Sequence, residues 1–249
     1  MSDVLTVLLA GLAGAAAAAI LGWTLRRRRP EPEDVTLGFL GPSLAALYLL
    51  VLALGVAAEW GTISDAHQGV TTEASALRQL YWSATGLPAG AAAVLRSEAR
   101  QYAATVVLHD WPQMARGTLD DQSLDMLGAM KETVLRVNPP NAASSAAQND
   151  SLIQLTTLNA VRAQREDDAG VRLPSGMVAG LIATSLVVAL FPFAVGIRSK
   201  LPSVILASTQ AALVVIGVVV IFQLDHAYSG PLAVRPYPIQ TLIQQIGSP

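Results

Sequence analysis

Four apolar runs dominate the hydrophobic pattern of this 249-residue chain, at residues 4–25, 35–58, 176–197 and 201–224. A membrane-spanning helix needs about 20 predominantly apolar residues, so each run is long enough to cross a bilayer. None of the four runs contains Asp, Glu, Lys, Arg or His. Ionisable groups inside the membrane mark proton relays and voltage sensors, and their absence disfavours those mechanisms. The pattern predicts an all-α integral membrane protein with four transmembrane helices.

Between the second and third runs, residues 59–175 show the spacing of amphipathic helices. Apolar residues recur every three or four positions and predict that the second span continues as a helix to about residue 85: Ile63, Ala66, Val70, Ala74, Leu77, Tyr81 and Ala84. Further helices are predicted at 88–109, 123–137 and 142–172. Trp111-Pro112 is predicted to end the first of these, because proline disfavours helix continuation. The insert is therefore predicted to be a helical bundle.

The tail, residues 225–249, carries a short apolar stripe formed by Ile239, Leu242, Ile243 and Ile246. Such a stripe can lie on the bilayer surface or pack against the insert. Docking on the insert is the favoured interpretation. The predicted division of the chain is thus spans at 1–58, bundle at 59–175, spans at 176–224 and tail at 225–249.

Two basic loops set the predicted orientation. Arg26, Arg27, Arg28 and Arg29 lie between the first two spans, and Arg198 and Lys200 lie between the last two. Short loops rich in Lys and Arg stay in the cytoplasm. Both termini, the bundle and the tail are then extracytoplasmic, and the protein is predicted to be a multi-pass protein of the bacterial cytoplasmic (inner) membrane.

The amino-acid composition excludes several classes of function. The formal net charge is −2 and the densest basic run is explained by topology, so no nucleic-acid partner is expected. The chain has no cysteine, and its three histidines show no zinc-site spacing. No phosphate-binding loop or hydrolase signature occurs. We therefore expect no enzyme activity and no cofactor or metal.

Charged residues on the apolar faces of the insert are the main candidates for a structural site. Glu73 lies in the first seam and Arg162 in the last, so the two can pair inside the bundle or form a salt bridge at its rim. Glu166-Asp167-Asp168 is interpreted as a solvated acidic face, with a divalent-cation site as the alternative.

The polar residues of the fourth span have two possible roles. Ser203, Ser208, Thr209 and Gln210 can form hydrogen bonds between packed helices or line a pore. Interhelical hydrogen bonding is the simpler interpretation.

Several short motifs, in their order along the chain, resemble the bacterial bestrophin-like family of unknown function. They are Val70-x-x-Glu73-x-x-x-Leu77, Tyr102, Trp111-Pro112, Arg162-x-x-Arg165, Leu173-Pro174 and Asp225…Tyr228-Ser229-Gly230-Pro231. The resemblance implies a distant similarity to bestrophins, which are oligomeric anion channels with four membrane helices per subunit. In bestrophins the region between the second and third spans is cytoplasmic, whereas Arg26–Arg29 predicts that this insert is outside.

Two functions remain open from the sequence. One is a channel for an inorganic anion that lies in the lipid bilayer and forms an oligomer by self-association. The other is a non-conducting envelope scaffold, accessory subunit or sensor whose helical bundle binds a protein partner. The resemblance favours the channel, and the large insert without evident chemistry favours the scaffold.

Overall fold

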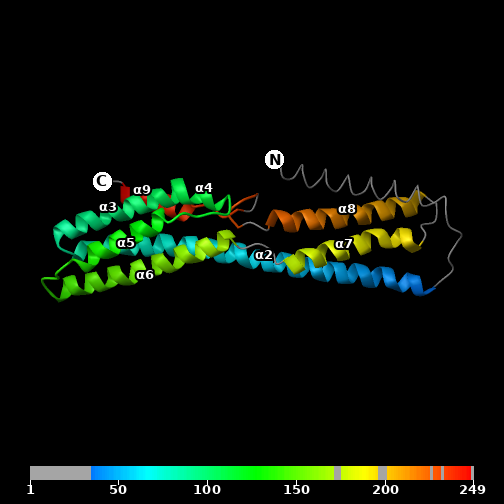
Figure 1. The fold of residues 1–249 in the computed structure, drawn as a ribbon, viewed down its shortest axis with the longest axis horizontal. Helices are drawn as coiled ribbons and strands as arrows, with labels where there is room; N and C mark the ends of the chain where they lie inside the picture. Colours follow the sequence, from blue (N-terminus) through cyan, green and yellow to red (C-terminus); the bar gives the residue numbers. More distant parts are fainter. Residues whose placement is uncertain (1–34, 171–174, 196–200, 225–226, 231–232, 248–249) are drawn as a thin grey trace. The chain divides into compact units, whose positions relative to one another are not determined.

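The computed structural model describes residues 35–170, 175–195, 201–224, 227–230 and 233–247, and within these ranges it contains helices and turns but no strand (Figure 1). The chain forms two compact units. The first, here called the apolar unit, comprises Met1–Gly61 and Arg172–Asp225, and the second, the bundle unit, comprises Thr62–Val171 and His226–Pro249. The tail thus belongs to the same unit as the insert.

Helix α2, Val35–Ser83, contributes to both units as one helix of 49 residues, which confirms the predicted continuation of the second span. Its exposed side chains change character along its length. In the apolar unit they include Leu50 and Leu54, whereas in the bundle unit they include Gln68, Thr71 and Ser75. A 3-10 turn, η1 (Ala84–Gly86), follows the helix.

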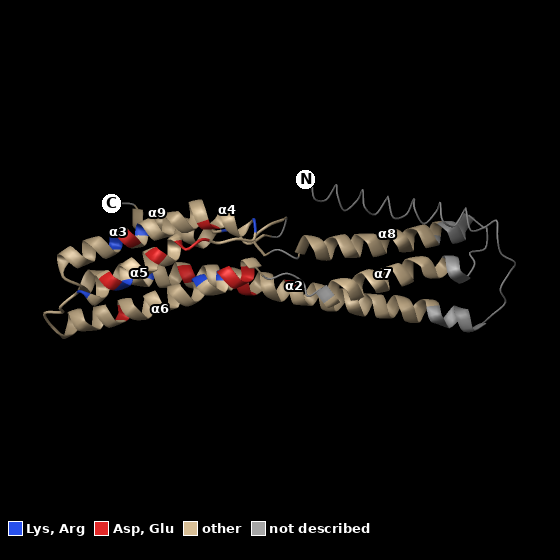
Figure 2. Ribbon diagram, in the orientation of Figure 1, with Lys and Arg blue, Asp and Glu red and all other residues tan. Residues whose placement is uncertain are grey.

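The apolar unit is built from the first part of α2 together with α7 (Ser175–Val195) and α8 (Leu201–Leu224). Its core contains Tyr48, Leu181, Val188, Val214 and Ile221. Large apolar side chains also cover its outside, including Leu49, Ile182, Leu186 and Leu213. Helices that are apolar on every side are typical of membrane spans. Figure 2 shows the charged residues on the bundle unit, and Glu59 is the one charged residue among the described residues of the apolar unit.

Two described helical segments, Gly41–Gly86 and Ala207–Leu224, are long and apolar enough to cross a membrane, and a shorter apolar segment covers Gly176–Pro192. The predicted span at 4–25 lies outside the described residues. The number of four spans therefore stays a prediction, while the all-helical fold is confirmed among the described residues.

The bundle unit combines the second part of α2 with the helices that follow it. These are α3 (Ala89–Thr105), the π-helical turn η2 (Val106–Asp110), α4 (Trp111–Met114), α5 (Gln122–Leu135), α6 (Ala142–Gly170) and α9 (Tyr237–Gly247). The predicted helices at 123–137 and 142–172 match α5 and α6 to within two residues at each end.

The prediction that Trp111-Pro112 ends a helix is wrong. The backbone stays helical through η2 into α4, and the N–H of Trp111 donates to the carbonyl of Val106, five residues earlier. In a regular α-helix the ring of Pro112 would clash with the carbonyl of Leu108. The wider π turn just before the proline relieves this conflict, so the helix ends only after Met114.

The tail packs into the core of the bundle unit, which confirms the docking interpretation. Ile239, Leu242 and Ile246 of α9 are buried in the same hydrophobic cluster as residues of α2 and α3 such as Val70 and Leu95. The apolar stripe therefore serves the bundle rather than lying free on a bilayer surface.

Candidate functional site

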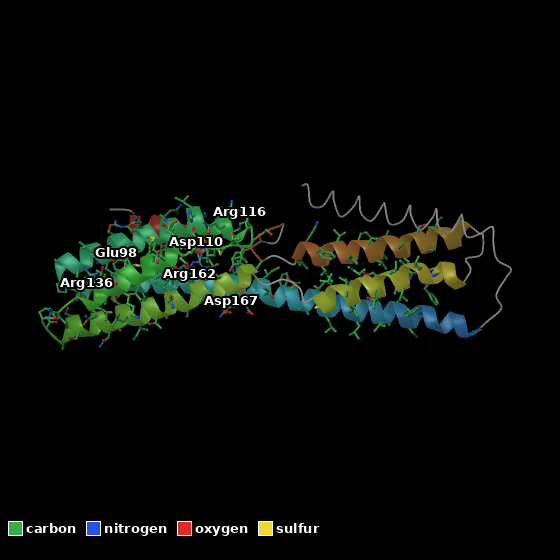
Figure 3. All side chains as sticks on the ribbon, viewed as in Figure 1. Glu98, Asp110, Arg116, Arg136, Arg162 and Asp167 are labelled. Atoms are coloured by element: carbon green, nitrogen blue, oxygen red, sulfur yellow. The ribbon has the colours of Figure 1, made fainter. Side chains whose placement is uncertain are left out.

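Six polar side chains from five helical elements meet inside the bundle unit and form what we call the buried charge cluster. Each is at most 2% exposed: Glu73 of α2, Tyr102 of α3, Asp110 of η2, Ser123 of α5, and Arg162 and Arg165 of α6. Figure 3 labels Asp110 and Arg162. Arg162 and Arg165 lie three residues apart and so share one face of α6.

Glu73 is held by two donors. The Tyr102 hydroxyl donates to its Oε1 at 2.7 Å, and a terminal nitrogen of Arg165 donates to the same oxygen at 3.0 Å. Arg165 also lies 3.5 Å from Asp110 Oδ2. The ion-pair partner of Glu73 is therefore Arg165 rather than Arg162, and the pair is buried, so the rim alternative is wrong.

Arg162 donates hydrogen bonds to a different set of acceptors. Its Nε donates to the Ser123 hydroxyl at 2.9 Å, and its two terminal nitrogens donate to Glu166 at 2.9 Å and to the backbone carbonyl of Asp120. This arginine thus fastens α6 to the start of α5. Ser123 was not predicted as a site residue, and a serine near a helix start is ordinarily interpreted as a cap.

The acidic triplet on α6 is only partly solvated. Glu166 pairs with Arg162 and Asp167 is exposed, but Asp168 is 8% exposed and accepts a hydrogen bond from Gln164. The interpretation of a solvated face is therefore wrong for Asp168. Its position on the buried side follows from the spacing, because Arg165 and Asp168 are three residues apart.

Burial dominates the electrostatics of the cluster. It raises the pKa of the Glu73 carboxyl, against the opposing effects of Arg165 and the Tyr102 hydroxyl. It also raises the pKa of Asp110, while the nearby Ser123 hydroxyl and Arg165 act in the other direction. Burial disfavours the Arg165 cation, but Glu73, Tyr102 and Asp110 together outweigh it and raise the Arg165 pKa. The guanidinium therefore stays charged.

Trp111 connects this cluster to the tail. The Arg165 guanidinium lies 5.8 Å from the centroid of the Trp111 ring, within range of a cation–π contact. The indole N–H donates to the carbonyl of Val234 at 3.1 Å, and the ring of Tyr228 meets Trp111 edge to face at 5.7 Å. The motif that contains Trp111 and the motif that contains Tyr228 are thus in contact, although they lie far apart in the sequence.

Gly230 lies in the turn that follows Tyr228, with a φ of 89° that favours glycine, and Pro112 lies in α4. Other predicted residues lie outside the described part of the chain. They are Pro174, Asp225 and Pro231 of the motifs and the topology-setting Arg26, Arg27, Arg28, Arg29, Arg198 and Lys200.

A recess of about 420 Å³ lies on the bundle unit and is lined by α2 and α6 without any charged side chain. Its lining residues are Gln68, Thr71, Thr72, Ser75, Ala76, Gln79, Gln154 and Thr157. The sequence-based prediction did not include this recess. Hydroxyl and amide side chains recur every three to four residues on α2, opposite the apolar seam, and this spacing could have predicted it.

Polar side chains of the apolar unit form hydrogen bonds between helices. Gln210 of α8 donates to the carbonyl of Val188 on α7 at 3.2 Å, and Tyr48 of α2 donates to the carbonyl of Val214 on α8 at 2.9 Å. This supports a packing role for Gln210. A pore-lining role for Ser208 or Thr209 stays a prediction, and the side chain of Ser203 lies outside the description.

Comparison with known proteins gives a consistent result. The Bestrophin-like domain model matches residues 7–239. Two variants of a bacterial bestrophin homolog from Klebsiella pneumoniae are similar in fold, each with a TM-score of 0.70. One is 14% identical and covers 99% of this chain and 100% of its own, and the other is 13% identical and covers 98% and 97%. A further crystallised membrane protein has a TM-score of 0.69 at 14% identity over 99% of this chain and 98% of its own. No curated protein matches the chain.

Proposed function

The chain belongs to the Bestrophin-like domain family, and from this membership we propose that it is a subunit of an oligomeric channel for inorganic anions in the bacterial inner membrane. The family is a channel-type membrane family and not an enzyme family. The described residues of the apolar unit agree with a passive role, because Glu59 is the one charged side chain among them and so few groups could drive coupled transport.

Beyond family membership, the uncharged recess on α2 and α6 is the structural observation that supports the proposal. Hydroxyl groups such as those of Thr72 and Ser75, and the amide of Gln79, offer O–H and N–H donors to a passing anion. Conduction requires binding that is favourable enough for entry and weak enough for release. Neutral donors meet both needs better than arginines, which would bind the anion more tightly. This wall is exposed in a single subunit, and we propose that further copies of the chain enclose it.

Chloride flux from liposomes tests the proposal. Vesicles that contain the purified protein are expected to release chloride faster than empty vesicles, and Thr72→Val is expected to change that rate severalfold, since one hydrogen bond is worth about 0.5–1.5 kcal/mol. Thr156→Val is the matched control, because Thr156 is exposed on α6 outside the recess. Absence of flux at every pH, calcium concentration and voltage would contradict channel activity.

The proposed orientation places both termini, residues 59–175 and the tail outside the cytoplasm, on the basis of the two basic loops. The chain has no native cysteine, so a single Asp150→Cys substitution on the exposed surface of α6 gives a clean reporter. An impermeant thiol reagent is expected to label it in intact cells. Labelling only after permeabilisation would place the bundle unit in the cytoplasm, as in bestrophins.

Exposed apolar side chains of the bundle unit favour a second candidate, a non-conducting scaffold or sensor that binds a protein partner. Trp82, Leu108, Ile153 and Tyr237 are each more than half exposed. Exposed aromatic and aliphatic side chains are common anchors of protein interfaces. Cross-linking in native membranes distinguishes the candidates: a stable heterologous partner with no ion flux supports the scaffold, and a homo-oligomer with flux supports the channel.

A further inference from the structure

We propose that His109, Asp110 and Asp120 form a binding site for a divalent transition-metal ion of the zinc class, at the edge of the buried charge cluster. One nitrogen of His109 and one carboxylate oxygen from each aspartate all lie within 4.8 Å of one another. Imidazole and carboxylate are ligands that suit zinc, whereas calcium takes six to eight oxygen ligands. Three protein ligands leave the fourth position of a tetrahedral ion for water or an exogenous ligand.

Asp110 is the observation that raises this group above an ordinary surface cluster. Its side chain is fully buried, and neither carboxylate oxygen has a hydrogen bond of normal length and angle among the described residues, although the Ser123 hydroxyl lies close enough to act on its pKa. Its nearest cation, Arg165, lies at 3.5 Å and is shared with Glu73 at a shorter distance of 3.0 Å. A buried carboxylate left this poorly satisfied is costly. A metal ion bound between Asp110 and its neighbours would satisfy it.

Local backbone geometry brings the three ligands together. His109 and Asp110 are consecutive residues in the π turn η2, and such turns often occur at functional sites. After α4 the chain reverses at Gly117, whose φ of 76° favours glycine. This turn returns Asp120 to within 3.6 Å of His109 Nδ1. Ligands of a tetrahedral zinc ion lie about 3.3 Å apart, so only small side-chain rotations are needed.

Gln113 fixes the tautomer that metal binding requires. Its Oε1 accepts from the backbone N–H of Asp120 at 3.0 Å, which leaves its Nε2 to donate to Asp120 Oδ2 at 2.8 Å and to meet His109 Nδ1 at 3.2 Å. Because the amide nitrogen is a donor, this contact assigns Nδ1 of His109 as the acceptor in the neutral ring. The lone pair of Nδ1 then faces the Gln113 amide, and a bound ion would replace the amide hydrogens as its partner.

The charge balance around the site also favours a cation. Ion pairs in and beside the cluster involve five acidic side chains, at positions 73, 110, 120, 121 and 166, against the arginines at 162 and 165. Acidic groups thus outnumber the arginines. A divalent ion would offset part of this excess, and it would do so next to the buried Asp110, where an uncompensated charge costs most.

Zinc titration of the full-length protein in detergent, without a polyhistidine tag, tests the proposal. Calorimetry is expected to show one Zn²⁺ per chain. His109→Ala and Asp120→Asn, both changes at partly exposed side chains, are each expected to weaken binding by more than tenfold. His67→Ala is the matched control, since His67 is exposed on α2 outside the group and its loss is expected to leave the affinity unchanged.

A second experiment reports the coordination of the bound ion rather than its affinity. Co²⁺ bound at the site is expected to give the visible absorption of a tetrahedral or five-coordinate ion, and His109→Ala is expected to abolish it. Asp110→Asn is expected to weaken Zn²⁺ binding as well, but the two more exposed variants decide the matter if that buried change impairs folding. Absence of zinc binding in the wild type, or equal binding in His109→Ala and Asp120→Asn, would overturn the proposal. Because channel activity enters none of these measurements, the proposed function can fail separately.

Discussion

The apolar unit and the bundle unit bury polar groups in opposite ways. In the apolar unit, Tyr48 and Gln210 extend across to the backbone carbonyls of neighbouring helices, and Glu59 is the one charged side chain among the described residues. In the bundle unit, Glu73 and Arg165 lie 3.0 Å apart as an ion pair at 0% and 1% exposure. Lipid tails are as apolar as leucine, so membrane helices gain little from burying apolar surface and depend on close packing. A bundle in water gains from every apolar side chain it buries and can offset the cost of an internal ion pair.

Removing the central cation should give the largest effect. Arg165→Met leaves Glu73 and Asp110 buried without their guanidinium, and it is expected to destabilise the bundle unit by about 3–5 kcal/mol. Thermal unfolding in detergent, followed by circular dichroism, measures the loss. Arg136→Met is the matched control, because its pair with Glu132 is exposed and worth about 0–1 kcal/mol. Equal effects in the two variants would mean that the buried pair adds no more than a surface pair.

Leucine truncation compares the two units directly. Leu158→Ala removes a fully buried side chain of the bundle unit and is expected to cost about 2–5 kcal/mol. Leu54→Ala, in the apolar unit, removes a side chain that is 60% exposed and is expected to cost much less, since surrounding lipid or detergent replaces its contacts. The same unfolding experiment reports both. A large loss for Leu54→Ala would show that another protein surface covers this face.

Close helix packing in the apolar unit should give an intermediate effect. A Cβ at Gly217 would lie 2.6 Å from the Tyr48 hydroxyl and 3.1 Å from Leu52, so Gly217→Ala must displace the tyrosine and its hydrogen bond to Val214. We expect a loss of about 1–3 kcal/mol. Gly180→Ala, at a helical glycine with open space, is expected to be neutral or stabilising. A neutral Gly217→Ala would show that α2 and α8 do not need this close contact.

The pH dependence of stability should give the smallest effect. Burial raises the pKa of Asp168, against the opposing Gln164, so the folded state holds this proton more tightly than the unfolded state. The stability from this group is complete below its unfolded pKa and is lost as pH rises through the folded pKa. As pH rises above about 4, the free energy of unfolding of Asp168→Asn should therefore fall less than that of the wild type.

Asp150→Asn is the control for this measurement, because Asp150 is exposed on the same helix. It should keep the pH dependence of the wild type. If the free energy of unfolding of Asp168→Asn still falls steeply with pH, other carboxyls cause the fall. Glu73 and Asp110 also have raised pKa values.

Periodicity predicted most of the bundle because helical spacing is a local property. The seam that includes Val70 and Leu77 is buried as expected, and the stripe of α9 docks as expected. The partner of Glu73 could not be predicted in the same way. Arg162 and Arg165 lie less than one helical turn apart on α6. Which of them pairs with Glu73 depends on the position of α6 along α2, and that position is set by tertiary packing rather than by the sequence of either helix alone.

The π turn escaped prediction for a related reason. Pro112 signals that the regular hydrogen-bond ladder cannot continue, but either a helix end or a widened turn satisfies that condition. The structure has the widened turn, which lets Trp111 reach Val234 and places Asp110 in the interior. The hydrogen bond from Trp111 to Val234 joins residues 123 positions apart, so no local pattern could show it.

The docking of the tail sets an order of events during synthesis. Core positions of the bundle unit are filled by Tyr228, Val234 and Ile239, which are made only after the residues of α7 and α8. Domains ordinarily fold in turn as the chain emerges, the amino-terminal part first. Here the core around Val70 and Leu95 stays incomplete until α9 has been translated. The bundle unit therefore reaches its final packing only after α7 and α8 have been synthesised.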